Sequence, residues 1–132
     1  MYGEVNQEAR QSSPLSNALF VNQEANSPLV GFLYSFSINE NGHHWPLRMG
    51  RMNIGSASDN DVVLSAPDIS ALHARIVVRK TPQETRIYIK DQESMNGTQV
   101  NDMEIFNGDP ILYSGDKITI GNVELYLLLI NT

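Results

Sequence analysis

The stretch from Ile54 to Asn101 decides the fold, because polar clusters alternate within it with short apolar runs. In chain order the clusters are Ile54-Gly55, Asp59-Asn60-Asp61, Ser70-Ala71-Leu72-His73-Ala74 and Ser94-Met95-Asn96-Gly97-Thr98-Gln99-Val100-Asn101. Gly, Asn, Asp and Ser are typical of turns, while the Val, Ile and Tyr residues between the clusters are typical of strands. The stretch therefore predicts short strands joined by polar loops.

Segments of the same kind continue outward, back to Leu29 and on to Ile130. None of them carries a long helical stripe. Tight turns with positive backbone dihedral angles are predicted at Asn41-Gly42, Asn96-Gly97, Asn107-Gly108 and Gly121-Asn122. The predicted strands are Leu29–Ile38, Trp45–Arg48, Met52–Ile54, Asp61–Leu64, Ala74–Arg79, Thr85–Asp91, Thr98–Val100, Met103–Ile105, Lys117–Ile120 and Val123–Ile130. We predict an all-β fold, a two-sheet antiparallel β-sandwich of about 10–11 strands.

The composition indicates one small soluble domain, since 132 residues with 41% hydrophobic content can bury a single core of ordinary size. Lys and Arg total 9 against 15 Asp and Glu, and the net charge of -6 disfavours broad binding to nucleic acid or to an anionic membrane. The chain has no cysteine, which excludes thiol chemistry and suits a reducing compartment. No apolar run approaches the roughly 18 to 20 residues that span a bilayer, and the polar, acidic start does not resemble a signal peptide. We expect a cytoplasmic location.

Residues 1–28 differ from the rest, because they are rich in Gln, Asn, Ser and Ala. Their only apolar cluster consists of Leu15, Leu19, Phe20 and Val21. We predict a flexible tail or linker over residues 1–28 and the folded domain over residues 29–132. The alternative is a short helix from Pro14 to Ala25 that docks on the sandwich or on a partner.

The order and spacing of the clusters resemble those of the forkhead-associated (FHA) domain, and the resemblance covers Phe32 to Ile130. It implies a β-sandwich whose loops at one end bind phosphothreonine peptides. It also implies a module without catalytic activity or cofactor, which acts on a protein partner and often forms part of a larger regulatory protein.

Individual residues take their expected roles from this resemblance. Ser70 matches the serine whose hydroxyl and local backbone donate to the phosphate. Asn96 matches the asparagine whose side-chain amide fixes the backbone of the bound peptide. The expected framework of the site consists of Gly55, His73, Gly97, Thr98 and Asn101.

Three positions depart from the family pattern. In that pattern Gly55 is usually followed by Arg and Ser70 often by Arg or Lys, whereas this chain has Ser56 and Ala71. Met95 occupies a place where many members have a hydroxyl residue that reaches the phosphate. Because Arg binds a phosphate through paired charge-assisted hydrogen bonds, we expect weakened phosphate binding. The candidates for supplying the missing charge are Arg51, Arg48 and Arg75, with Arg51 the main one.

Two functions within the binding class follow, together with one rival class. The first is a phosphothreonine-dependent adaptor, and the second is a phospho-independent interaction or oligomerisation module that keeps the fold. A hydrolase built on Ser70, His73 and Asp91 or Asp68 is the rival, which we reject because the chain offers no nucleophile elbow.

A metal site is also not predicted. Asp59-Asn60-Asp61 lacks the spacing of a calcium loop, and the adjacent His43 and His44 would point to opposite faces of a strand.

Overall fold

The computed structural model describes residues 27–106 and 108–130, and these residues form ten strands and no helix. The bounds of the strands are β1 Leu29–Ser35, β2 His43–Arg48, β3 Gly50–Gly55, β4 Val62–Val63, β5 Ala74–Lys80, β6 Thr85–Asp91, β7 Thr98–Val100, β8 Met103–Glu104, β9 Lys117–Ile120 and β10 Val123–Leu129. The predicted tail falls outside the described residues except for Ser27 and Pro28, and the alternative helix at Pro14–Ala25 falls outside them entirely. Within the described residues, no helix has the length and apolarity needed to cross a membrane.

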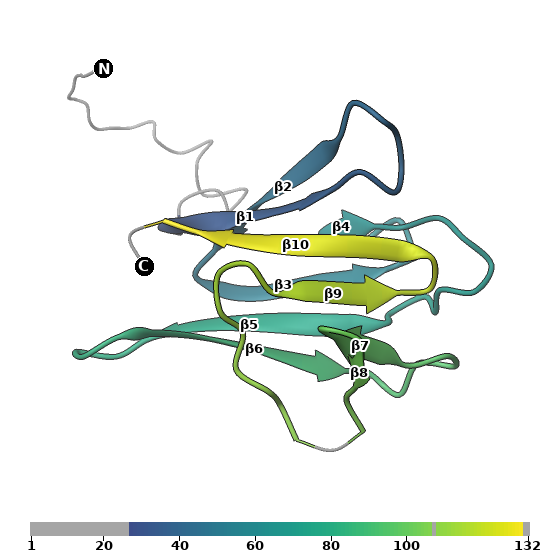
Figure 1. Ribbon diagram of the computed structural model, residues 1–132. Coiled ribbons are helices and arrows are strands. Elements are labelled where there is room, and N and C mark those ends of the chain that lie inside the picture. Colours follow the sequence, from purple (N-terminus) through teal and green to yellow (C-terminus); the bar gives the residue numbers. More distant parts are fainter. Residues whose placement is uncertain (1–26, 107, 131–132) are drawn as a thin grey trace.

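The strands form two sheets that pack face to face (Figure 1). One sheet has six strands in the order β2-β1-β10-β9-β7-β8, and the other has four in the order β4-β3-β5-β6. Inward-facing side chains alternate with outward-facing ones along the central strands, as in β5, where Ala74, Ile76 and Val78 are buried and Arg75 and Val77 are partly exposed. The core lies between the sheets, which confirms the predicted all-β sandwich.

The predicted strands match the observed ones to within three residues at each end. The largest difference is at β1, which was expected to reach Ile38 but ends at Ser35. There the hydroxyl of Ser35 accepts a hydrogen bond from the backbone N–H of Ser37 at 3.1 Å, and this local turn ends the ladder.

One pair of neighbouring strands in the sandwich is parallel, namely β3 and β4. Ile54 pairs with Val62 and Gly55 with Val63. Residues 56–61 form an arch that returns the chain alongside β3 in the same direction, and the N–H of Asn60 donates to the carbonyl of Ala57 inside this arch at 3.2 Å.

The predicted turn glycines adopt positive φ angles of 89° at Gly42, 86° at Gly97, 80° at Gly108 and 58° at Gly121. The turn at Gly97 and the loop after β3 lie at one end of the sandwich, while β1 begins and β10 ends at the other (Figure 1). The polar clusters of the sequence thus gather at the end that is remote from where the described chain enters and leaves.

Candidate functional site

Three loops meet at this end: residues 56–61 between β3 and β4, residues 64–73 between β4 and β5, and residues 92–97 between β6 and β7. The first two are joined by backbone hydrogen bonds from Ser56 N to Ser70 O at 3.0 Å and from Ala57 N to Ala71 O at 3.2 Å. The side-chain amide of Asn60 adds a bond to Ala71 O at 2.6 Å. Ser56, Ser70 and Ala71, which were predicted to lie together, therefore do so.

Gly55 stands where the two loops approach most closely. A Cβ atom at this position would meet the carbonyl oxygen of Ala71, and it would lie 2.8 Å from the amide nitrogen of Asn60. No side chain fits without moving the backbone of the β4–β5 loop. The close contact between the loops depends on this glycine.

His73 connects the β4–β5 loop to the β6–β7 loop. Its ring is fully buried, with an exposed fraction of 0%. The Nδ1 atom accepts a hydrogen bond from the backbone N–H of Ser70 at 3.1 Å, and Nε2 lies 2.7 Å from the carbonyl oxygen of Gly97. Because Nδ1 accepts, Nε2 carries the proton and donates it to that carbonyl. The imidazole is thus a bridge between two backbone segments.

Asp91 organises the third loop. Its carboxylate accepts hydrogen bonds from the hydroxyl of Ser94 at 2.5 Å, from the backbone N–H of Ser94 at 3.0 Å and from the hydroxyl of Thr98 at 2.7 Å. Burial alone would raise the pKa of Asp91, but these hydrogen bonds outweigh burial and lower the pKa below its ordinary value. The hydroxyl of Ser94 also accepts from Gly97 N at 2.9 Å, which fixes the turn.

The roles of Asn60, Asp91 and Ser94 were not predicted from the sequence. The predicted role of Asp91 was confined to the rejected hydrolase, and Asn60 was named only within the rejected calcium loop. The spacing Asp-x-x-Ser at the end of a strand is typical of a side chain that caps a turn, and this signal would have found the Asp91–Ser94 pair.

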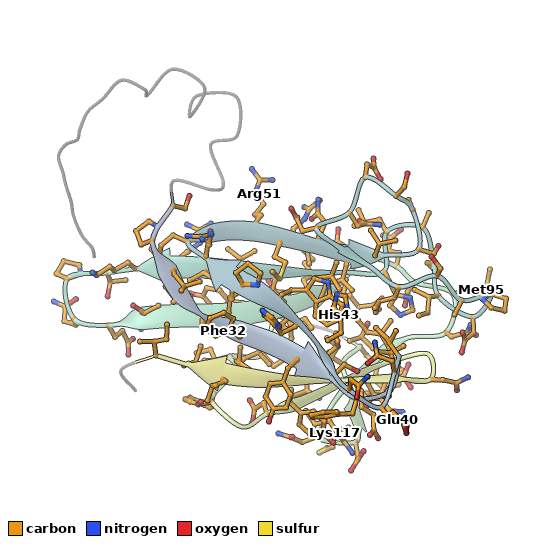
Figure 2. All side chains as sticks on the ribbon, turned by 90° about the horizontal axis from the view of Figure 1, so that it is seen from above. Phe32, Glu40, His43, Arg51, Met95 and Lys117 are labelled. Atoms are coloured by element: carbon orange, nitrogen blue, oxygen red, sulfur yellow. The ribbon has the colours of Figure 1, made fainter. Side chains whose placement is uncertain are left out.

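Ser70, Met95 and Asn96 come together across the second and third loops. The hydroxyl oxygen of Ser70 accepts the backbone N–H of Met95 at 3.0 Å, which leaves the hydroxyl proton available to a ligand. The amide nitrogen of Asn96 donates to the carbonyl of Asp68 at 3.0 Å. Met95 itself has an 86% exposed side chain at the tip of the molecule (Figure 2).

Two of the predicted residues lie apart from this group. Arg51 sits on β3 beside Val77, four residues before Gly55, and Figure 2 shows it far from Met95. Asn101 lies at the other end of β7, where its amide bonds to Asp116 Oδ1 at 2.9 Å and its Oδ1 accepts from Lys117 N at 2.9 Å. The structure therefore does not bring Arg51 or Asn101 together with Ser70.

The loop end has an acidic character. No Lys or Arg occurs in residues 56–61, 64–73 or 92–97, whereas the same segments contain Asp59, Asp61, Asp68 and Glu93. Arg75 is the second residue of β5, and its Nε donates to Asn53 Oδ1 at 2.8 Å rather than to Ser70. An anion at Ser70 would therefore be held by neutral donors.

The arrangement of Ser70 and His73 is not that of a nucleophile and its base. Both ring nitrogens of His73 are hydrogen-bonded to backbone groups, and neither meets the Ser70 hydroxyl. Among residues 27–106 and 108–130, no three His, Cys, Asp or Glu side chains are grouped as metal ligands.

The chain is similar in sequence and in structure to proteins of one family. The model of the FHA domain matches residues 52–121, which include all three loops of the site. This chain belongs to the FHA family. Among solved structures, an FHA domain from a structural and functional analysis of phosphothreonine-dependent FHA domain interactions has 25% sequence identity and a TM-score of 0.64, covering 77% of this chain and 99% of that one.

Two other solved structures are similar to this chain. Mycobacterium tuberculosis EmbR in complex with a low-affinity phosphopeptide has 26% identity and a TM-score of 0.65, covering 86% of this chain and 29% of that chain. The FhaA FHA domain complexed with the intracellular domain of Rv3910 has 27% identity and a TM-score of 0.60, covering 73% of this chain and 98% of that chain.

Curated relatives are much longer than this FHA chain. The ABC transporter ATP-binding/permease protein Rv1747 of Mycobacterium tuberculosis is 41% identical over 76 residues, which are 58% of this chain and 8% of the relative. The DNA damage response protein kinase DUN1 of Saccharomyces cerevisiae is 38% identical over 72 residues, which are 52% of this chain and 14% of the relative. The chain thus spans less than a sixth of the length of either relative.

Proposed function

We propose that this FHA domain is a non-catalytic interaction module that binds a phosphothreonine peptide of a protein partner through its loop end. The observation that carries the proposal is the convergence of Ser70 and Asn96, the two residues that resemble the family's ligand contacts, on loops braced by His73. The solved relatives that bind phosphopeptides or a protein partner support it. The proposal includes a cytoplasmic location, which the absence of cysteine suits.

In this proposal Ser70 donates its hydroxyl proton to the phosphate, and the hydroxyl of Ser56 lies on the adjacent loop. The Asn96 amide already donates to Asp68 O, so its Oδ1 is the atom that accepts a peptide N–H. Gly55, His73, Gly97 and Thr98 hold the loops in place. Asn101 acts only at a distance, by fixing β7 to the start of β9.

Phosphate affinity is expected to be low, because the three loops of the site contain four carboxylates and no Lys or Arg. Loss of one member of a buried charged pair costs about 2–5 kcal/mol, and about 2 kcal/mol corresponds to a roughly thirtyfold change in affinity. An arginine introduced at Ser56, on the loop that contacts Ser70, would restore this interaction. Ala71 offers a second position for the same purpose.

The proposal is tested by titrating phosphothreonine peptides into the native chain and into Ser56→Arg, with Ser56→Gln as an uncharged control of similar length. We expect weak binding by the native chain, a gain of about thirtyfold in Ser56→Arg and little change in Ser56→Gln. The gain should vanish for the unphosphorylated peptide. Tight phosphate-dependent binding by the native chain with no benefit from Arg at position 56 would show that other groups already supply the charge.

A second function is favoured by the acidic loop end, which repels a phosphate dianion. In this alternative the same loops bind an unphosphorylated partner, or the domain forms an oligomer. Equal affinity for phosphorylated and unphosphorylated peptides, or a dimer in sedimentation experiments that Met95→Asp dissociates, would support the alternative over the phosphothreonine proposal.

A further inference from the structure

The outward face of the four-stranded sheet carries an unusual concentration of positive charge. Arg51 on β3, Arg75 and Arg79 on β5 and Lys90 on β6 line one hollow of about 830 Å³. These are four of the nine Lys and Arg residues of a chain whose net charge is -6. We call this set of four residues, with Val77 and Tyr88 at its centre, the basic face.

The strand register explains why these residues share a surface. Along β5, Arg75 is paired with Lys90 of β6, and Val77 is paired with Tyr88 of β6 and with Arg51 of β3. Arg79, two residues further along β5, is paired with Arg86. Side chains two residues apart on a strand point the same way and lie about 7 Å apart along it. The basic face therefore begins at the second residue of β5, next to the loop end, and extends about 14 Å along the sheet.

The charges of the basic face are not neutralised within the described structure. The ion pairs found among residues 27–106 and 108–130 involve Arg86 with Glu84, and Lys117 with Asp102 and Glu124. Of the four cations in the hollow, Arg75 donates to the neutral amide of Asn53. Asp109 is the one carboxylate among the residues that line the hollow.

The chemistry of the hollow favours an acidic polypeptide. Three of the four cations are arginines, whose planar guanidinium groups bind carboxylates through paired hydrogen bonds. The half-buried side chains of Val77 and Tyr88 provide an apolar centre with a charged rim, which is typical of protein interfaces. A nucleic acid or a lipid surface would not use a small apolar centre of this kind, and the net negative charge of the chain opposes binding to either.

We propose that the basic face binds an acidic segment of the partner whose phosphothreonine binds at the loop end, with one apolar side chain of that segment packing on Val77 and Tyr88. This inference rests on the proposed function for the position of the phosphate. The acidic segment supplies affinity that the loop end, lacking arginine, does not. The two contacts together then select a phosphothreonine flanked by Glu or Asp.

The test uses the full chain and two phosphothreonine peptides that contain a leucine and four flanking glutamates, placed before the phosphothreonine in one and after it in the other. Matched peptides carry glutamine in place of glutamate, and all four are also made without phosphate. Affinity is measured by fluorescence anisotropy at 0.05 and 0.3 M salt. One glutamate peptide should bind about three- to tenfold more tightly than its glutamine counterpart, as expected for two or three exposed ion pairs, and the difference should shrink at high salt.

Substitutions in the chain test whether the preference for glutamate arises from the basic face. Arg51→Gln and Arg79→Gln should each reduce the preference for glutamate by about twofold or more. Lys80→Gln is the matched control, because it removes one charge from the same strand at a residue outside the hollow. An equal reduction in Lys80→Gln, or equal binding of the glutamate and glutamine peptides by the native chain, would overturn the inference.

The peptides made without phosphate distinguish the contribution of the phosphate to affinity from that of the acidic segment. A glutamate preference that persists without phosphate, while phosphate adds nothing, would support the basic face and contradict the proposed function. Phosphate-dependent binding without any glutamate preference would support the proposed function and overturn the inference. Binding of phosphatidylserine vesicles or duplex DNA that Arg51→Gln and Arg79→Gln weaken, without a preference for glutamate, would also overturn it.

Discussion

The imidazole of His73 joins two loops of different origin, since it accepts from Ser70 N and donates to Gly97 O while fully buried. His73→Ala removes both hydrogen bonds and leaves two backbone groups without a partner, so we expect the free energy of unfolding to fall by about 1–3 kcal/mol. Ser70→Ala removes only an acceptor at an exposed backbone N–H and should cost less than about 1 kcal/mol. Urea denaturation of both variants measures the difference.

Phosphopeptide affinity should change in the opposite order, with the larger loss in Ser70→Ala. Ser70→Ala should abolish phosphopeptide binding in a chain that is still folded, while His73→Ala should weaken binding only as far as it loosens the loops. An unchanged free energy of unfolding in His73→Ala, together with complete loss of binding, would contradict the bracing role and assign His73 to the ligand.

Asp91 makes the stability of the third loop depend on pH. Its pKa is lowered in the folded state, so its contribution is fully present above the ordinary Asp value near 3.8 and is lost as pH falls through the lower, folded value. Asp91→Asn should therefore be less stable than the native chain at pH 6, and the gap should narrow on acidification below about pH 4. Guanidinium denaturation at pH 6 and at pH 3 measures the gap. A gap of the same size at both pH values would mean that the hydrogen bonds to Asp91 do not depend on its charge.

The sequence predicts well the placement of those side chains that have a fixed spacing around a turn. Ser56, Ser70, Ala71, Met95 and Asn96 come together because their loops are short and anchored on adjacent strands. The position of Arg51 could not be predicted in this way. A shift of one residue in the register of β3 would turn its side chain from one face of the sheet to the other. Asn60 was missed because its contact with Ala71 joins two loops across 11 residues of sequence.

Among the elements, β1 is central, since it lies between β2 and β10 in the six-stranded sheet. Gly31 sits at a register shift of the β1–β2 pair. A Cβ atom there would collide with the backbone carbonyl oxygen of Leu128 and would lie 3.1 Å from the Cα of Leu129. Because backbone atoms cannot move aside as a flexible side chain does, Gly31→Ala should lower the free energy of unfolding by about 1–3 kcal/mol.

Amide chemical shifts distinguish this cause from a general loss of stability. Gly31→Ala should shift the amide signals of Leu128 and Leu129 on β10. Gly50→Ala is a suitable comparison, because its Cβ would meet nothing within 4 Å, and the only cost there is a φ angle of 105°. Unchanged signals on β10 in Gly31→Ala would show that the strand accommodates the methyl group.

The sequence predicts strands more reliably than it predicts their partners. Alternation of buried and exposed residues marks β5 and β6 clearly, and both were predicted to within one residue. The pair Val62–Val63 is too short to show a pattern, and its parallel alignment depends on the arch at residues 56–61. Pairing of this kind is set by loop geometry and not by the strand's own residues.

In the whole molecule, charge is distributed unevenly between its surfaces. The three loops of the site contain four acidic residues and no Lys or Arg, while four of the nine basic residues lie on one face of the four-stranded sheet. Figure 2 shows Arg51 and Lys117 on opposite sides of the sandwich, and Lys117 is already paired with Asp102 and Glu124. The net charge of -6 gives no indication that acidic and basic residues lie on different surfaces. This distribution follows from the strand register.

Residues 27–132 should fold without residues 1–26, because the buried apolar core found among residues 27–106 and 108–130 runs from Leu33 to Leu127. The cut leaves intact the bonds of Ser27 O with Arg48 Nη1 at 2.8 Å and of Pro28 O with Met49 N at 3.0 Å. We expect an all-β circular dichroism spectrum and a cooperative melt within a few degrees of that of the full chain, since a shift of about 1 kcal/mol moves the Tm of such a domain by about 4–8 °C. A second truncation that also removes β1 is the control, and it should not fold, because β2 and β10 would lose their shared neighbour. A non-cooperative melt or a helical spectrum after the first truncation would place part of the folded domain before Ser27.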